Sequence, residues 1–259
     1  MGKLTEQYFS TYLSLLDINI SKLFEDVKQI EWNVKNFTFF TAVSVMASSK
    51  IEGEPLDVDS YVKHKVLQIE YLANLTEKPN DLYKAYEFAR DHSLSLENFL
   101  EVHSIATLNL LPPTQRGKIR TGNMVIMEQQ TNRIQYEAAS LYIVKKEFEL
   151  FWVELSILIN LDLSIEEIFY YASFIHLVFV KIHPFNDGNG RTGRLLEKWF
   201  LATKLGEKAW FIGSENYYYQ NLQSYYNNLA RIGLFYEELN YEKGLPFFQM
   251  LPNALIIKK

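Results

Sequence analysis

The chain has 259 residues, of which 48% are hydrophobic and 15% aromatic. This composition supports a substantial core in one domain, or in one domain with a small appendage, and argues against disorder. The formal net charge of −5 lacks the basic character of nucleic-acid-binding proteins, so we expect no nucleic-acid partner.

Cysteine is absent, which excludes disulfides and thiolate metal sites and fits a reducing compartment. The N-terminus, MGKLTEQYFSTYL, lacks the basic start and unbroken apolar run of a signal peptide. Lys181 and His183 interrupt the most apolar stretch, which is then too short to span a bilayer. The sequence therefore predicts a cytoplasmic protein without a membrane partner.

Helical periodicity dominates the chain. Apolar residues recur at helical spacing over residues 6–30, and a second apolar segment, residues 37–51, leads to Gly53, a residue type that favours helix C-termini. Ser164 is the predicted N-cap of a helix that must end before Pro184, because a proline pushes the preceding residue out of the α region. Two further helices are predicted over residues 191–205 and 215–232.

Residues 116–127, RGKIRTGNMVIM, break this helical pattern. Glycines at turn positions stand beside a short β-prone run, which is typical of a hairpin or an extended loop. On composition alone, a surface connection is the simpler interpretation of this segment.

Residues 183–194 read HPFNDGNGRTGR and predict a helix end, a tight turn and a new helix start. The glycines allow positive φ and let successive N–H groups face one concavity, to which the next helix adds unpaired donors and its positive end. Arg191 and Arg194 project from one face of that first turn. Cations there oppose the helix dipole, and a polyphosphate would offset their cost.

Two side chains in this segment could carry chemistry. Asp187 offers a hard oxygen ligand of the kind that holds Mg²⁺ against phosphate oxygens. His183 could take a proton from a hydroxyl near neutral pH. Each residue alone has a simpler interpretation as part of a cap, a turn or a solvated face. Their combination within twelve residues favours a polyphosphate site, and Gly117-Lys118 lacks the rest of a P-loop.

The pattern His183-Pro184-Phe185-x-Asp187-Gly188-Asn189-Gly190-Arg191-x-x-Arg194 resembles the Fic family signature at every defined position. The resemblance implies an all-α fold, a Fic-type helical bundle with a short β-hairpin flap beside the active site. It also implies ATP as substrate, Mg²⁺ as cofactor, and transfer of AMP to a Ser, Thr or Tyr hydroxyl of a target protein.

The resemblance further implies a role for each motif residue. His183 would be the general base, Asp187 the metal ligand, and Arg194 the group that holds the γ-phosphate. The full set of expected ATP- and phosphate-binding residues is Gly188, Asn189, Gly190, Arg191, Thr192, Gly193 and Arg194.

Two other segments resemble family features. The segment Met124, Val125, Ile126 and Met127 resembles the flap, although Tyr136-Glu137-Ala138-Ala139 stands where the family usually has a proline pair. Tyr225 and Tyr226 resemble the tyrosine pair near the family's adenine pocket, and packing in the core is an equal alternative for them.

A third similarity lies upstream. The stretch from Ser48 to Gly53, SSKIEG, resembles the family's inhibitory pattern, [S/T]-x-x-x-E-[G/N]. Ser48 and Glu52 share one helical face. The resemblance implies an autoinhibited enzyme with an N-terminal inhibitory helix near residues 40–53, in which Glu52 pairs with Arg194 and blocks the γ-phosphate position.

We expect an N-terminal helical segment over residues 1–39, a Fic domain over 40–235, and a C-terminal tail, 236–259, packed on the core. The predicted function is a protein adenylyltransferase autoinhibited by Glu52. A hydrolase that removes AMP, with Glu52 orienting water, and a low-turnover nucleotide-binding regulatory module are the alternatives. Self-modification, a homodimer and transfer of another nucleotide stay open, and the target protein cannot be read.

Overall fold

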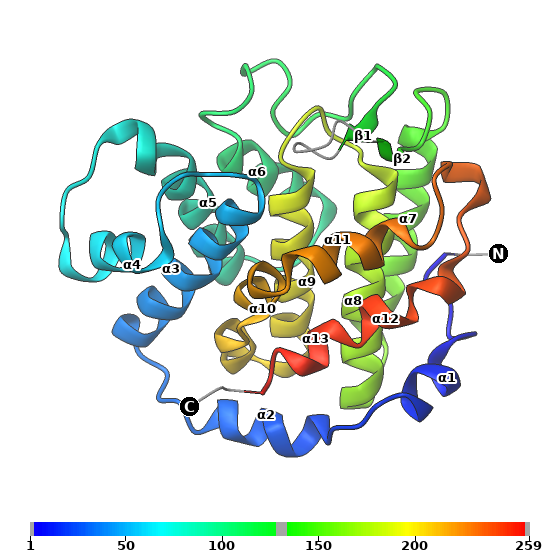
Figure 1. Ribbon diagram of the computed structural model, residues 1–259, viewed down its shortest axis with the longest axis horizontal. Coiled ribbons are helices and arrows are strands. Elements are labelled where there is room, and N and C mark those ends of the chain that lie inside the picture. The colour runs from blue at the N-terminus through cyan, green and yellow to red at the C-terminus, as the bar shows by residue number, and fades with distance from the viewer. Residues whose placement is uncertain (1–2, 128–133, 257–259) are drawn as a thin grey trace.

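The computed structural model describes residues 3–127 and 134–256, so the predicted terminal segments are described without residues 1–2 and 257–259. In this part of the chain, helices form the body of the molecule and a small antiparallel sheet of two strands lies at its edge, which confirms the predicted all-α class with a hairpin (Figure 1). The longer elements, in chain order, are α1 Phe9–Ser14, α2 Ile20–Lys28, α3 Val34–Ile51, α4 Val58–Leu67, α5 Ala73–Asp91, α6 Leu96–Ala106, β1 Val125–Met127, β2 Ile134–Glu137, α7 Val144–Asn160, α8 Ile165–Ile182, α9 Asn189–Leu205, α10 Ser214–Gln220 and α11 Leu222–Ala230. Short helices complete the chain: η1 Glu207–Phe211, η2 Tyr236–Glu238, η3 Tyr241–Gly244, α12 Leu245–Phe248 and α13 Met250–Asn253.

Helices α8 and α9 form the centre of the molecule (Figure 1). Ser164 begins α8 with a reciprocal capping box, because its hydroxyl accepts from the backbone of Glu167 while the Glu167 carboxylate accepts from the Ser164 N–H. Every residue of α8 from position 168 to 182 is buried. A Cβ on Gly193 of α9 would lie 3.0 Å from Phe179, so a glycine there permits the two helices to approach closely. The predicted start and end of α8 are confirmed.

Helix α3 leads to the site from one side. Asn33 caps its N-terminus by accepting a hydrogen bond from Asn36 N at 2.8 Å. The helix ends at Ile51, with Gly53 following at φ 87°, a left-handed conformation that glycine adopts without steric cost. The predicted end of this helix is confirmed.

Two segments predicted as single helices are each divided. Within residues 6–30 the chain leaves the helix after Ser14 and restarts at Ile20, because the Asn19 side chain caps α2 by accepting from Lys22 N at 2.8 Å. Within residues 215–232 the break falls at Asn221, whose φ of −116° and ψ of 38° separate α10 from α11. Apolar periodicity continued across both breaks and hid them.

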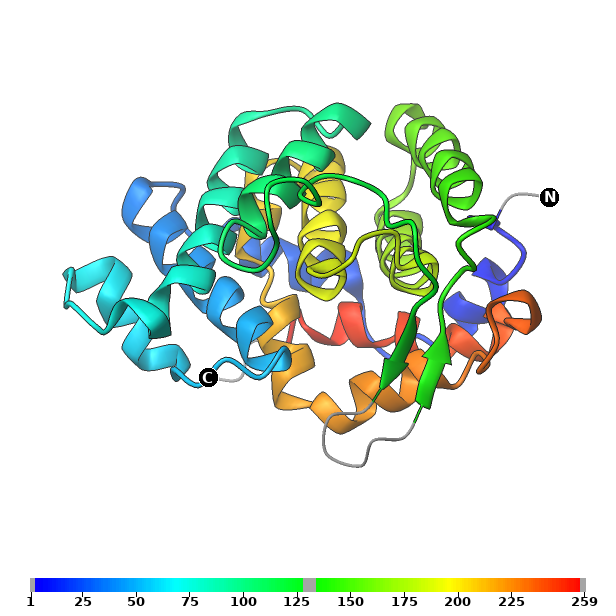
Figure 2. The same cartoon turned by 90° about the horizontal axis from the view of Figure 1, so that it is seen from above.

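The hairpin is formed by β1 and β2, with Ile126 opposite Tyr136 and Val125 opposite Glu137. Seen from above, the hairpin extends across one end of the helices, near α11 (Figure 2). Only its first strand lies in the segment that was predicted to form a hairpin or loop, and residues 116–124 form the connection that leads to it. Residues 128–133, between the strands, lie outside the described residues.

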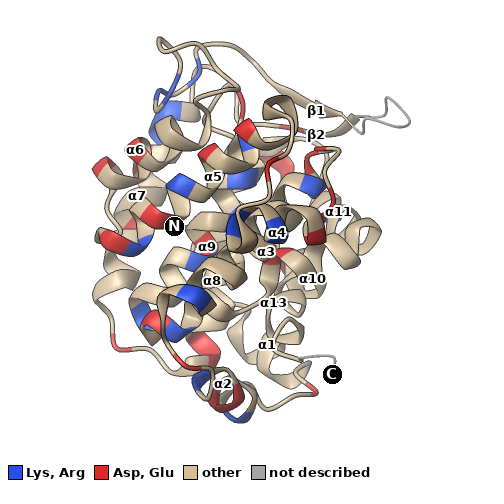
Figure 3. Ribbon diagram, turned by 90° about the vertical axis from the view of Figure 1, so that its left-hand side faces the viewer, with Lys and Arg blue, Asp and Glu red and all other residues tan. Residues whose placement is uncertain are grey.

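Helices α4 to α7 were not predicted from the sequence patterns. Acidic and basic residues are interspersed along the helices on the side that carries α3 to α6 (Figure 3). Within residues 3–127 and 134–256, no helix combines the length and the apolar character needed to cross a bilayer.

Candidate active site

A cavity of about 510 Å³ lies between the hairpin, the end of α3, the start of α9 and helix α11. It brings together residues from separate parts of the chain that were singled out in the sequence, namely Glu52, His183, Gly190, Arg194, Tyr225 and Tyr226. Ile126 and Met127 of the flap segment also line it, as do Gln135 and Tyr136 from the opposite strand.

His183 is the residue at which α8 ends, and its φ of 51° places it in the left-handed region. Its ring Nδ1 lies 3.1 Å from the carbonyl of Val180. That carbonyl has no helical donor, because the residue four positions ahead is Pro184, which lacks an N–H. A carbonyl only accepts, so Nδ1 carries the proton and Nε2 keeps a free lone pair.

The pKa of His183 is lowered to about 4 by burial, with smaller contributions from the charges of Arg120 and Lys181. The hydrogen bond to Val180 and the charge of Glu52 act in the opposite direction. The imidazole is therefore neutral at pH 7, the state in which its Nε2 can accept a proton.

The turn before α9 is held by its own side chains. Gly188 has φ 79°, and a Cβ there would lie 2.6 Å from a methyl carbon of Thr107. Asn189 accepts from Phe185 N at 2.9 Å and donates to Phe185 O at 2.8 Å. Thr192 donates to Gly188 O at 2.8 Å. These contacts fix the backbone whose N–H groups open the helix.

The structure therefore separates the predicted phosphate-binding residues into two groups. Gly190 and Arg194 line the cavity, whereas the side chains of Asn189 and Thr192 are buried within the turn. Gly193 faces α8. Residues 189, 192 and 193 shape the site without directing a side chain into it. The spacing of the motif did not reveal which of its residues line the cavity and which only support the turn.

Arg194 is 1% exposed and donates four hydrogen bonds. Its Nε bonds Ser48 Oγ at 2.8 Å, and its Nη2 bonds Ser48 O at 3.0 Å and Glu52 Oε1 at 2.6 Å. Its Nη1 lies 3.2 Å from the hydroxyl of Tyr225. The structure thus joins Ser48, Glu52 and Arg194, the three residues that the sequence motifs had linked.

The Glu52 side chain is 32% exposed and is ionised in this arrangement. Burial acts to raise its pKa, but the charges of Arg194 and Arg191 and the hydrogen bond from Arg194 outweigh that effect and hold the pKa below 4.5. The carboxylate lies at the N-terminal end of α9, where a helix favours an anion.

A second carboxylate, which the sequence motifs did not indicate, engages the other arginine. Glu54 Oε1 accepts from Arg191 Nη2 at 2.9 Å and lies 3.2 Å from Lys78 Nζ. Lys50 holds the same loop by donating to Glu54 O at 2.9 Å. Glu52 and Glu54 thus reach Arg194 and Arg191 from one short loop. Two arginines in a first turn, each in need of an anion, were the signal that could have pointed to Glu54.

Asp187 is exposed and does not line the cavity. Its Oδ1 accepts from Gly188 N at 2.6 Å. Its backbone carbonyl accepts from Nε2 of the buried His103 at 2.9 Å, while Gly117 N donates to Nδ1 of that ring at 2.8 Å. Sequence reasoning missed His103, which supports the turn from beneath.

Among the described residues, no group of three or more His, Asp or Glu side chains is arranged to hold a metal ion. Magnesium often binds through one or two carboxylates together with water and substrate phosphates. The single carboxylate of Asp187, beside the turn that precedes α9, fits that mode of binding rather than an all-protein cage.

Tyr225 and Tyr226 lie at the far side of the cavity. Tyr225 is 1% exposed, and its hydroxyl lies 3.0 Å from His176 Nε2 as well as 3.2 Å from Arg194. Tyr226 is half-buried and donates to Ile51 O at 3.0 Å. Tyr225 therefore packs in the core and braces Arg194, and Tyr226 is the more accessible of the two.

Arg120 joins the flap to the end of α8. Its side chain is 2% exposed and donates to the His183 carbonyl at 2.8 Å, and to the carbonyls of Gly122 and Ala139. Arg120 thus satisfies a helix-end carbonyl and fixes both ends of the flap next to His183. Of the predicted flap residues, Met124 and Val125 lie outside the cavity lining.

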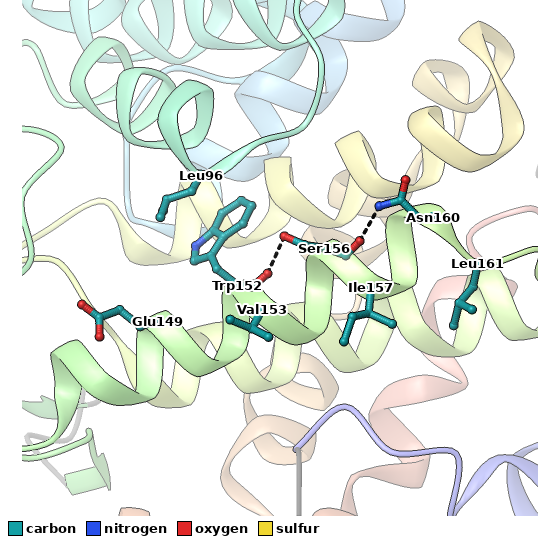
Figure 4. A pocket seen from close by; sticks show the side chains of 8 residues that line it. All are labelled: Leu96, Glu149, Trp152, Val153, Ser156, Ile157, Asn160 and Leu161. Atoms are coloured by element: carbon teal, nitrogen blue, oxygen red, sulfur yellow. Dashed lines mark hydrogen bonds between the residues drawn. The ribbon is translucent and has the colours of Figure 1, made fainter.

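A larger groove, of about 800 Å³, lies between α6 and α7 (Figure 4). Leu96, Trp152, Val153 and Ile157 make it mostly apolar, and the hydroxyl of Ser156 is used within α7 on the Trp152 carbonyl. It contains no combination of base, arginine and helix N-terminus. The chemistry-bearing residues converge on the smaller cavity.

Residues 93–201 match the model of the Fic/DOC family. The chain is 31% identical over 106 residues to the protein adenylyltransferase fic-1 of Caenorhabditis briggsae. That similarity covers 40% of this chain and 18% of the relative, so the chain matches less than one fifth of the relative's length.

Two solved structures share the fold. A Fic family protein from Desulfovibrio desulfuricans G20 superposes with a TM-score of 0.73 at 18% identity, over 96% of this chain and 72% of that chain. A Fic-domain-containing signaling protein from Bacteroides thetaiotaomicron VPI-5482 gives a TM-score of 0.65 at 18% identity, over 92% and 94%. At this identity the likeness establishes the fold alone.

Proposed function

We propose that this protein transfers AMP from ATP to a Ser, Thr or Tyr hydroxyl of a target protein. The observation that carries the proposal is the His183 ring, whose Nδ1 is bound to Val180 O and whose Nε2 is free at a cavity that also contains Arg194. The name of the C. briggsae relative, a protein adenylyltransferase, supports the same reaction class.

The step is an in-line displacement at the α-phosphorus of ATP. Nε2 of His183 takes the hydroxyl proton as the target oxygen bonds to the α-phosphorus. The bond from that phosphorus to the bridging oxygen breaks, and pyrophosphate leaves with the electron pair. A positioned base contributes about 10²–10⁴ to the rate of such a step.

The start of α9 and Arg194 would bind the negatively charged phosphates of ATP. Unpaired N–H groups at the N-terminus of a helix bind phosphate oxygens, and a planar guanidinium such as that of Arg194 binds a terminal phosphate in two places. Asp187 would hold Mg²⁺, which when bound neutralises charge on the phosphates. Arg191 shares this helix turn, and its side chain neutralises Glu54.

In the same proposal, Glu52 inhibits the enzyme. Its carboxylate occupies the guanidinium that would clamp the γ-phosphate, and Ser48 fixes that guanidinium from behind. ATP must displace Glu52 before all three phosphates can bind in the reactive arrangement. The free enzyme is therefore held in a state with little transfer activity.

Radiolabelled ATP tests the proposal on the full chain. Wild type, Glu52→Gly, Glu52→Gly/His183→Ala and Glu52→Gly/Arg194→Ala would be incubated with ATP, Mg²⁺ and a lysate, and labelled proteins identified by mass spectrometry. We expect label transfer to rise in Glu52→Gly and to fall at least about 10²-fold in both double variants. Exposed Arg231, changed to Ala in the Glu52→Gly background, is the matched control and should leave transfer unchanged. Transfer by the His183→Ala double variant at the Glu52→Gly rate would contradict the mechanism.

A hydrolytic reaction at the same site is the second candidate, and one observation favours it. Glu52 lines the cavity with His183, and its Oε2 accepts no hydrogen bond from any described residue. That oxygen could orient a water molecule whose oxygen bonds to the phosphorus of an AMP-modified side chain while Nε2 of His183 takes the water proton. The bond from the phosphorus to the side-chain oxygen then breaks, and His183 returns the proton to that oxygen, so that the side chain leaves as its hydroxyl and AMP is released. AMP release by wild type and not by Glu52→Gly would identify this direction.

A further inference from the structure

Tyr136, on the second strand of the hairpin, is 4% exposed and lies directly beside the base. Its hydroxyl donates to Val180 O at 2.9 Å and lies 3.3 Å from Nδ1 of His183. Val180 O is the same carbonyl that Nδ1 contacts at 3.1 Å. Two polar groups, the Tyr136 hydroxyl and the His183 ring, thus meet at one helix-end carbonyl.

The direction of these hydrogen bonds follows from the carbonyl. Val180 O can only accept, so the Tyr136 proton points to it and the phenol oxygen presents its lone pairs to the imidazole. The proton on Nδ1 of His183 then has an acceptor on each side, the carbonyl and the phenol oxygen. Both acceptors disfavour the alternative tautomer, in which Nδ1 carries no proton and its lone pair faces two oxygen atoms.

A buried amine holds the tyrosine ring from its other side. Lys181 Nζ lies 3.7 Å from the centroid of the Tyr136 ring, is fully buried, and has no hydrogen-bond partner among the described residues. An amine over a ring face is attracted by the negative face of the aromatic system. Burial lowers the pKa of Lys181 to about 7.

We propose that Tyr136 is a positioning residue that holds the His183 ring with Nε2 free, and that Lys181 fixes the Tyr136 ring in place. The inference rests on the proposed function, in which His183 is the base. Because Tyr136 belongs to the hairpin, the orientation of the base depends on the seating of the flap. A flap that binds the target segment would therefore also orient the group that activates its hydroxyl.

The test is Tyr136→Phe, which removes only the hydroxyl and keeps the ring over Lys181. Nitrogen-15 correlation spectra of the full chain report which ring nitrogen of His183 carries the proton, with His183→Ala used to assign the signals. Tyr170→Phe is the matched control, because its hydroxyl donates to Thr5 O at 2.7 Å outside the cavity lining. Thermal melts verify that each variant is folded.

In Tyr136→Phe we expect the chemical shifts of the two ring nitrogens to move toward each other, as the second tautomer becomes populated, whereas Tyr170→Phe matches wild type. In the Glu52→Gly background, kcat should fall about three- to tenfold, with KM for ATP within about twofold. Lys181→Met should shift the nitrogen signals in the same direction, and it decides the matter if Tyr136→Phe does not fold.

Wild-type nitrogen shifts in folded Tyr136→Phe would overturn the inference, whatever the activity. If no variant of the chain transfers AMP, the proposed function fails, but the spectra still decide whether Tyr136 orients His183. The two failures are therefore distinguishable.

Discussion

The carboxylate of Glu52 lies against the backbone of Gly190, so closely that a Cβ at position 190 would be 2.2 Å from Glu52 Oε1. The acidic side chain thus rests on the first turn of α9 while it bonds Arg194. A helix N-terminus and a guanidinium are the two groups that bind a phosphate most readily. Glu52 therefore occupies a place suited to an anionic ligand.

Glu52→Gln separates the charge of Glu52 from its bulk. The amide oxygen can still accept from Arg194, but the pair loses the stronger charge-assisted bond. We expect the ATP affinity of Glu52→Gln, measured by calorimetry, to lie between the affinities of wild type and Glu52→Gly. Each 1.4 kcal/mol by which the interaction between residue 52 and Arg194 is weakened should raise ATP affinity about tenfold. Equal affinities for wild type and Glu52→Gln would show that bulk, not charge, excludes the nucleotide.

Asp187→Asn tests the proposed metal ligand without disturbing the turn. The amide oxygen of Asn can replace Oδ1 as acceptor for Gly188 N, whereas the negative charge is lost. ATP affinity should fall about tenfold in the presence of Mg²⁺ and stay unchanged in its absence. Asn186→Ala, an exposed neighbour, serves as control. The same Mg²⁺ dependence in Asp187→Asn and wild type would remove Asp187 from the metal site.

Acid should weaken the fold before the carboxylates titrate, because of the buried His103. Its Nδ1 accepts from Gly117 N and its Nε2 donates to Asp187 O, so both nitrogens are satisfied only in the neutral ring. Burial lowers the pKa of His103 from 6.5 to about 4. The unfolded chain thus binds more protons between these values, and the free energy of unfolding falls as pH decreases through that window.

The loss attributable to His103 amounts to at most about 3 kcal/mol between pH 6.5 and 4, and His183 acts in the same direction. Urea unfolding at several pH values measures it. The free energy of unfolding of His103→Gln should be lower than that of wild type near neutrality. Above about pH 4.5, where carboxylates contribute little to the pH dependence, this free energy should also vary less with pH than in wild type. An unchanged pH dependence in this variant would exclude His103 as the cause.

Glu54→Ala should cost more stability than its position in a loop suggests. Glu54 and Arg191 are both at least nine-tenths buried and form an ion pair at 2.9 Å. Removal of one partner from a buried pair leaves the other charge uncompensated, at a cost of about 3–5 kcal/mol. Exposed Glu149→Ala should change the free energy of unfolding by less than about 0.5 kcal/mol. Equal values for the two variants, from chemical denaturation, would contradict this account.

The site residues that could be predicted from the sequence are those with a local pattern. The Ser164 cap, the turn at Gly188 and the spacing of Arg191 and Arg194 depend on neighbours within four residues, which the sequence displays directly. Glu52 was predicted because its motif is also local, although its partner lies 142 residues away.

The supporting residues could not be predicted because their partners are remote. Glu54 is separated from Arg191 by 137 residues, His103 from Asp187 by 84, and Arg120 from His183 by 63. Each pair is brought together by the packing of helices in three dimensions, and such contacts leave no periodic pattern in the sequence. Tyr136 occupies a place where the family pattern differs, and its separation of 47 residues from His183 hid its contact with the His183 ring.

Because Glu52 and Glu54 share one loop, a single displacement of that loop would break both ion pairs, with Arg194 and with Arg191. A partner that draws this loop away from α9 would raise the affinity for a triphosphate by some factor. Thermodynamic linkage requires the triphosphate to raise the affinity for that partner by the same factor. The end of α3 would then act as an effector site, at which partner binding and triphosphate binding strengthen each other. This coupling would require no change in residues 183–194.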